Sequence, residues 1–113
     1  MRGAEFVAAG SVTAPFTIGV LKVAEMECFV YILGSSGKGG YRTYVGWTND
    51  LDRRLAQHNA GTGARSTRGR VWVLLYAEQY LTRREAMSRE WHLKRDRQLR
   101  RRLLSAAPQL QSE

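Results

Sequence analysis

The stretch CFVYILGSSGKGGYRTYVGW, residues 28–47, decides the fold. Residues 28–33 are a continuous run of β-forming side chains, which is typical of a strand buried on both faces. Residues 34–40 are almost entirely Gly and Ser, and β-forming residues resume at 41–47. Two such runs around a Gly-rich connection predict a β-hairpin.

A helix is predicted directly after this hairpin. Residues 48–50 (Thr-Asn-Asp) supply candidates for the N-cap. Leu51, Leu55 and His58 then recur at helical spacing, which predicts a helix that ends at about Asn59.

The C-terminal half predicts one more strand and two more helices. A Gly-rich basic loop at 60–70 leads into β-forming residues at 71–80. Thr82 and Glu85 have the spacing of a capping box that opens a second helix, and 97–104 predicts a third.

The order of these elements predicts an α+β fold with a small central antiparallel three-stranded sheet flanked by helices. The domain is expected to span 26–104, with a flexible tail at 105–113. Residues 1–25 are expected to be an N-terminal extension. Two interpretations of it stay open: it precedes a native start at Met26, or it forms an extra arm, because 16–23 contains strand-forming residues.

Charge is unevenly distributed along the chain. The chain has 18 Lys and Arg against 10 Asp and Glu, a net charge of +8. Basic residues are densest at 82–104, where nine of them accompany three acidic residues. Such a concentrated positive field predicts a polyanionic partner, most simply nucleic acid, bound in a salt-dependent manner. A purely solubilising charge and an anionic membrane surface are the alternatives.

The single cysteine and the hydropathy pattern exclude several classes of protein. Cys28 alone can form neither an internal disulfide nor a multi-cysteine zinc site. No apolar stretch approaches the roughly 20 residues that span a bilayer. Polar residues interrupt 1–25, so no secretory signal is expected, and the cytoplasm is the expected location.

Three ionisable side chains in the predicted helices suggest chemistry. Arg54 and His58 are four residues apart, hence neighbours on one helix face, and they suit phosphate binding and proton transfer. Glu90 borders the apolar side that Met87 and Trp91 are expected to form, where a carboxylate is either paired or bound to a metal. From spacing alone, an ordinary surface role for each stays open.

Two tyrosines are central in the hairpin strands, Tyr31 in the first and Tyr44 in the second. Buried tyrosines are usually packing residues. A phenol also orients or deprotonates a water molecule where neighbouring cations lower its pKa. The residues alone leave both interpretations open.

The joint order of these motifs is more specific than any one of them. They are VYI at 30–32, YVG at 44–46, RRLxxHN at 53–59 and EAxxxE at 85–90. In this arrangement residues 28 to about 104 resemble the GIY-YIG endonuclease superfamily. The loop GxGARxT at 61–67, followed by REAMxREWxLK at 84–94, is similar to the small single-domain bacterial branch. It also resembles the nuclease domain of structure-selective enzymes that cut branched DNA.

The resemblance implies a role for each candidate residue. Tyr31 and Tyr44 line the active site, and Tyr31 is the preferred activator of the attacking water. Arg54 grips the scissile phosphate, and His58 aids proton transfer. Glu90 binds one Mg²⁺ or Mn²⁺ ion, which stabilises the leaving oxygen.

The chain departs from the family pattern at three positions. Val30 stands in place of the first motif's glycine and Val45 in place of the second motif's isoleucine, and both remain β-formers. Arg102 stands where some relatives carry an asparagine, so an asparagine-assisted step is not implied here.

Basic residues outside this constellation are candidates for contacts with backbone phosphates, which set affinity and register but not sequence choice. They are Lys38, Arg42, Arg53, Arg65, Arg68, Arg89 and Lys94. The sequence thus predicts an Mg²⁺- or Mn²⁺-dependent DNA endonuclease, selective for structure, in DNA repair or recombination. The alternatives are a non-catalytic nucleic-acid-binding module and a nuclease active only with a larger partner protein; the oligomeric state stays open.

Overall fold

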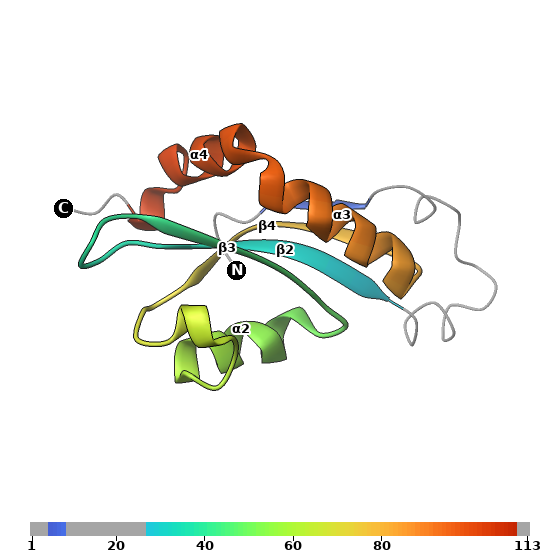
Figure 1. Cartoon of the computed structure of the whole chain (residues 1–113), viewed down its shortest axis with the longest axis horizontal. Coiled ribbons are helices and arrows are strands. Elements are labelled where there is room, and N and C mark those ends of the chain that lie inside the picture. Colours follow the sequence, from blue (N-terminus) through green and yellow to red (C-terminus); the bar gives the residue numbers. More distant parts are fainter. Residues whose placement is uncertain (1–4, 9–26, 111–113) are drawn as a thin grey trace.

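The computed structural model describes residues 5–8 and 27–110, which form a β-sheet with helices on both faces (Figure 1). The strands are β1 (Glu5–Ala8), β2 (Cys28–Ser35), β3 (Arg42–Thr48) and β4 (Val73–Tyr80). The helices are α2 (Leu51–Ala60), α3 (Arg83–Arg95) and α4 (Arg97–Ser105), with short 3-10 turns η2 (Arg65–Thr67) and η3 (Pro108–Leu110).

The sheet has the strand order β1-β4-β2-β3. Strand β2 pairs in antiparallel fashion with both β3 and β4, so that Tyr31 lies opposite Gly46 on one side and Ala77 on the other. This confirms the predicted three-stranded antiparallel sheet. Strand β1 adds a fourth strand, parallel to β4, from within the N-terminal extension. The strand considered at 16–23 lies outside the described residues.

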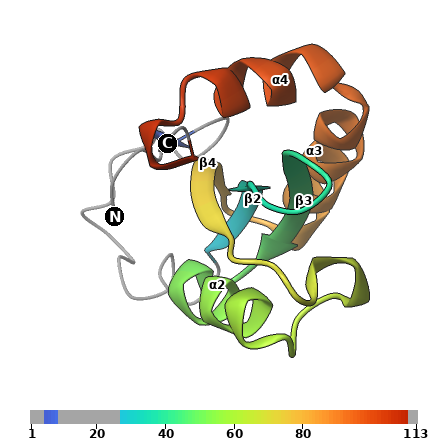
Figure 2. The ribbon, with the colours of Figure 1, turned by 90° about the vertical axis from the view of Figure 1, so that its left-hand side faces the viewer.

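The two faces of the sheet are covered by different helices. Helix α2 packs on one face, and α3 and α4 pack on the other (Figures 1 and 2). Because side chains alternate along a strand, Val30 and Ile32 of β2 join the core under α3, while Tyr31 and Leu33 join the core under α2. Strand β2 is therefore buried on both faces, as its continuous apolar run predicts.

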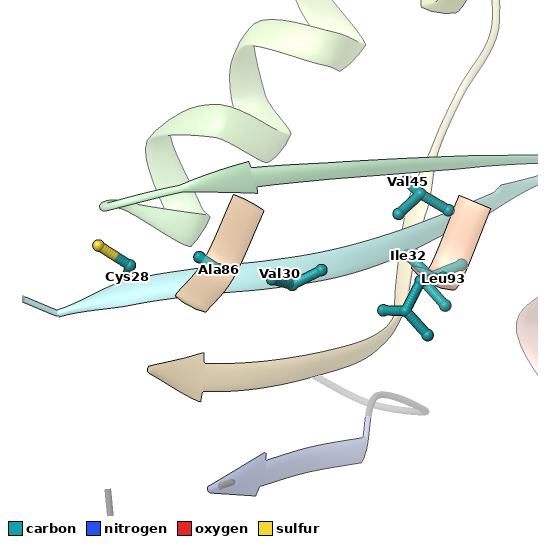
Figure 3. Packing of buried hydrophobic residues seen from close by; sticks show 6 residues of the cluster. All are labelled: Cys28, Val30, Ile32, Val45, Ala86 and Leu93. Atoms are coloured by element: carbon teal, nitrogen blue, oxygen red, sulfur yellow. The ribbon is translucent and has the colours of Figure 1, made fainter. Parts of the chain in front are cut away.

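Helix α3 packs through a stripe that begins with the small residue Ala86. Ala86 and Leu93 are both fully buried, and Figure 3 shows them beside the β-sheet valines and isoleucine. Met87 and Trp91 are 45% and 53% exposed, so the prediction that they face inward is wrong. The indole of Trp91 instead lies under the guanidinium of Arg95, 3.7 Å from the ring centroid, on the outer side of the helix.

Residues 105–110, the described part of the predicted flexible tail at 105–113, pack against the sheet, contrary to that prediction. Ala107 and Leu110 are buried and share a cluster with Leu75 of β4. Gly34 of β2 makes this possible, since a Cβ atom there would lie 2.6 Å from Leu75 and 2.9 Å from Leu110. Residues 105–110 thus belong to the domain.

None of the helices between residues 27 and 110 combines the length and the apolar character needed to cross a membrane. The longest, α3, has 13 residues.

Candidate active site

Helix α2 presents Arg54 and His58 to the sheet face formed by β2 and β3. The carboxylate of Asp50 caps the helix by accepting the amide N–H of Arg53 at 3.1 Å, which fixes where the helix begins and therefore which residues point inward. His58 is fully buried, and Arg54 is half-buried one turn before it.

Tyr31 and Tyr44 meet His58 on this face. The Oη atom of Tyr31 lies 2.8 Å from Nε2 of His58, and the Tyr44 ring centroid lies 4.8 Å from that of the imidazole. Gly46 gives the Tyr31 hydroxyl its space, because a Cβ atom there would lie 2.7 Å from Oη. The structure thus brings together the two predicted tyrosines and the predicted histidine.

Hydrogen bonds around His58 fix its tautomer. The Oγ1 hydroxyl of Thr67 donates to the carbonyl oxygen of Ala64 at 2.8 Å, and this contact occupies its only proton. Thr67 must therefore accept at its second contact, which makes Nδ1 of His58 the donor, also at 2.8 Å. A neutral imidazole carries one N–H, so Nε2 is an acceptor and receives the phenolic proton of Tyr31.

The loop at 60–70 holds Thr67 against the histidine. The indole Nε1 of Trp72 donates to the Thr67 carbonyl at 2.8 Å. The Asn59 side chain accepts from the backbone N–H of Trp72 at 2.6 Å and donates to the backbone carbonyl of Trp72 at 3.1 Å. A Cβ atom on Gly63 would lie 2.7 Å from Nδ1 of His58. The sequence singles out this loop for its basic residues and for a motif that contains Gly63 and Thr67, but it does not predict the contacts of these two residues with His58.

Burial keeps the tyrosine–histidine pair neutral. Burial raises the pKa of Tyr31 to about 12, the interaction with Arg54 opposes this, and the charges of Tyr44 and Glu90 add to it. Burial, followed by the positive charge of Arg54, lowers the pKa of His58 to about 4. In the protein alone, the pKa of Tyr31 is therefore raised and not lowered.

Arg54 is positioned without being neutralised. Its Nη1 donates to Oε1 of Gln57 at 3.0 Å, a partner that sequence analysis did not identify. Hydrogen bonding to Tyr31 raises the pKa of the Arg54 guanidinium above its ordinary value. Among the salt bridges of the described residues, none involves Arg54, so its charge remains available to an anion.

Glu90 extends from α3, which lies on the other face of the sheet. It falls in the buried stripe between Ala86 and Leu93, its side chain is 19% exposed, and Nζ of Lys94 lies 3.4 Å from its carboxylate. Its charge is one of those that raise the pKa of Tyr31. Across residues 5–8 and 27–110, no three His, Cys, Asp or Glu side chains gather as a metal cage. Metal binding by Glu90 remains a prediction.

Arg89, one of the predicted phosphate contacts, forms an ion pair with Glu78, and its contact with phosphate remains a prediction. Its guanidinium donates to both carboxylate oxygens of Glu78, at 2.8 Å and 3.0 Å. Burial opposes ionisation of Glu78, but hydrogen bonds from Arg89, Tyr76 and Tyr80 lower its pKa overall. Because Glu78 is only 3% exposed, its carboxylate requires such partners. Arg89 is therefore part of the hydrogen-bond network around Glu78.

Four of the remaining predicted phosphate contacts are exposed on the hairpin and on the loop at 60–70: Lys38, Arg42, Arg65 and Arg68. Two others form weak ion pairs, Arg53 with Asp50 at 3.8 Å and Lys94 with Glu90. All six remain predictions.

Arg70 has a structural role that the sequence did not reveal. It donates to the Ser35 hydroxyl at 3.0 Å and to the carbonyls of Lys38 and Gly40 at 3.1 Å and 2.6 Å. These bonds tie the loop at 60–70 to the tip of the β2–β3 hairpin.

Comparison with known proteins identifies relatives of this chain. Residues 27–102 match the family model described as the GIY-YIG catalytic domain. A UPF0213 protein of Clostridium perfringens is 46% identical over 68 residues, which cover 59% of this chain and 70% of that protein. A UPF0213 protein of Halobacterium salinarum is 47% identical over 66 residues, covering 58% and 82%. The solution NMR structure of a UPF0213 protein from Bacillus halodurans is 33% identical, with a TM-score of 0.41, and the match covers 78% of this chain and 100% of that one. By the extent of its match to the family model, the chain belongs to the GIY-YIG catalytic domain family.

Proposed function

We propose that this protein is a divalent-metal-dependent endonuclease that hydrolyses phosphodiester bonds in DNA. One observation carries the proposal: an unneutralised guanidinium, Arg54, lies beside a neutral Tyr31–His58 pair whose acceptor nitrogen faces the phenol. Membership of a catalytic domain family supports nuclease activity. The net charge of +8 supports a polyanionic substrate.

The residues present fit Mg²⁺ or Mn²⁺. Glu90 offers hard carboxylate oxygens, and its only ion-pair partner among the described residues is Lys94, at 3.4 Å. Mg²⁺ is commonly held by one or two carboxylates, with waters and substrate phosphate oxygens as its other ligands. Such an ion, when bound, supplies charge neutralisation at the leaving oxygen.

The protein's own residues then handle the phosphate and the proton. Arg54 holds the scissile phosphate and stabilises the charge that develops on it. Oη of Tyr31 takes a proton from the attacking water while the phenolic proton passes to Nε2 of His58. The resulting hydroxide bonds to phosphorus, the bond from phosphorus to the leaving oxygen breaks, and that oxygen is protonated from solvent.

The enzyme selects its substrates by DNA structure and not by base sequence. The exposed cations Lys38, Arg42, Arg65 and Arg68 suit contacts with backbone phosphates, which carry no sequence information. Branched, nicked and flapped DNA are therefore the substrates of choice, consistent with work in DNA repair or recombination alongside a larger partner protein.

Cleavage of a labelled DNA panel tests the proposal. Flapped, nicked, branched and plain duplexes are incubated with Mg²⁺, Mn²⁺ or EDTA, and the products are resolved on denaturing gels. Glu90→Gln is expected to lower the single-turnover rate at least 100-fold in Mg²⁺.

Glu85→Gln provides the matched control, since it removes the same charge from the same helix while glutamine still serves a capping box. Its rate should stay within about threefold of the parent. Equal rates for the parent and Glu90→Gln, or cleavage that persists in EDTA, would refute the proposal.

A further inference from the structure

Two adjoining hollows lie between the start of β3 and helix α4, on the sheet face opposite α2. The first, of about 280 Å³, is lined by Thr43, Leu104 and three arginines, which are Arg97, Arg100 and Arg101. The second, of about 340 Å³, is lined by Tyr41, Arg101, Leu104 and Ser105. They adjoin, because Arg101 and Leu104 line both, and together they are hereafter called the α4 groove.

The arginines of the α4 groove differ in their contacts. Arg100 donates to the Leu93 and Lys94 carbonyls at 3.3 Å and 2.6 Å and to the Thr43 hydroxyl at 3.2 Å, which locks α4 onto α3 and β3. Arg97 and Arg101 are exposed, lie one helical turn apart, and take part in none of the salt bridges among the described residues. In the first hollow, Arg100 is therefore held in place by hydrogen bonds, whereas Arg97 and Arg101 are exposed cations with no salt bridge among the described residues.

The second hollow has a different lining. Tyr41 exposes 51% of its surface at the hairpin tip, and Leu104 provides an aliphatic wall. A partly exposed aromatic ring beside a cationic rim is the arrangement on which an unpaired base stacks while its phosphate is held. The two hollows match the two parts of a nucleotide, an anion and a planar ring.

We infer that the α4 groove binds one nucleotide of a single-stranded nucleic-acid segment. Its phosphate lies between Arg97 and Arg101, and its base lies on Tyr41. The inference rests on the proposed function for the class of substrate. None of the residues that line the groove is among those assigned to cleavage, so binding there can be measured separately from cleavage.

Fluorescence anisotropy in EDTA measures this binding without cleavage. The probes are a labelled ten-nucleotide oligo-dT and a blunt ten-base-pair duplex, titrated with the full chain from 50 to 300 mM KCl. Arg101→Ala should weaken binding of the strand about threefold to tenfold and reduce the magnitude of its salt slope by roughly 0.7. Tyr41→Ala should weaken binding of the strand roughly tenfold and binding of the duplex less than twofold.

Arg102→Ala is the matched control, because Arg102 is exposed on the same helix but lies outside the groove lining. A loss in Arg101→Ala no larger than that in Arg102→Ala, or an unchanged affinity of Tyr41→Ala for the strand, overturns the inference. Vesicles of phosphatidylglycerol form a further arm. Vesicle binding that depends on Arg101, with strand affinity independent of it, also overturns the inference in favour of a membrane surface.

Because no step of this assay requires catalysis, failure of the proposed nuclease activity would leave these affinities interpretable. Circular dichroism melts of each variant confirm that a loss of affinity does not arise from unfolding.

Discussion

Tyr31 donates its phenolic proton to Nε2 of His58 across 2.8 Å, with both groups neutral. The direction of this hydrogen bond follows from Thr67. Its hydroxyl donates to the carbonyl of Ala64 and so accepts from Nδ1 of His58, which leaves Nε2 as the acceptor. With a pKa of about 12, Tyr31 is almost entirely a neutral phenol near pH 7, and a neutral phenol is not an effective base by itself. Its value to hydrolysis comes from an acceptor already in place for its own proton.

The two tyrosines should therefore differ in their contribution to cleavage. Tyr31→Phe removes the hydroxyl that exchanges protons with His58, and we expect a single-turnover rate at least 100-fold lower. Tyr44→Phe removes a hydroxyl near Arg54 that has no such bond to His58, and about tenfold is expected. Rapid-quench rates at saturating enzyme measure both, and the reverse order would assign the water-activating role to Tyr44.

Thr67 should act as a positioning residue through the tautomer of His58. Thr67→Val retains the shape of the side chain but leaves Nδ1 without an acceptor, so a 10- to 100-fold lower rate is expected. Thr67→Ser keeps the hydroxyl and should restore most of the rate. Nitrogen-15 NMR of the imidazole provides an independent readout: the parent and Thr67→Ser should show the proton on Nδ1, and loss of that signature should accompany loss of rate in Thr67→Val. A serine variant as slow as the valine variant would contradict the relay.

The elements of the fold followed from local signals in the sequence. The continuous apolar run of β2, the glycine-rich turn and the capping residues Asp50 and Thr82 place the hairpin and two helices. The outward position of Trp91 and the buried Leu110 did not follow, because both depend on which long-range neighbours have room. Ala86 determines the contact face of α3, and Gly34 admits Leu110.

The site was only partly predictable for the same physical reason. Spacing on a helix brings Arg54 and His58 together, and the resemblance to a family adds the tyrosines and Glu90. The contacts of Thr67 and Gly63 with His58 could not be predicted in this way, since only the fold places the Thr67 hydroxyl 2.8 Å from the imidazole. The two charges of Glu78 and Arg89, eleven residues apart in sequence, likewise reveal their pairing only in the folded chain.

Acid should destabilise the protein through His58. Because the folded-state pKa is lowered from 6.5 to about 4, the unfolded chain binds the proton first as the pH falls. Stability should be constant above about pH 7 and fall between pH 6.5 and 4, by on the order of 3 kcal/mol over the whole window. Urea midpoints across that window measure it. His58→Gln should flatten the slope, whereas a control at exposed His92, His92→Gln, should keep it; an unchanged slope in His58→Gln would exclude His58 as the cause.

The ion pair of Arg89 and Glu78 should contribute to stability and not to DNA affinity. Arg89→Ala leaves the buried Glu78 carboxylate without its cation, and we expect a loss of about 3–5 kcal/mol in the free energy of unfolding. Arg84→Ala is the control, since Arg84 is exposed on the same helix and its loss should change stability by less than about 0.5 kcal/mol. Denaturant unfolding and DNA titrations of the folded variants distinguish the two roles. If Arg89→Ala were as stable as Arg84→Ala but bound DNA several-fold more weakly, the phosphate contact first predicted for Arg89 would be correct and the interior role wrong.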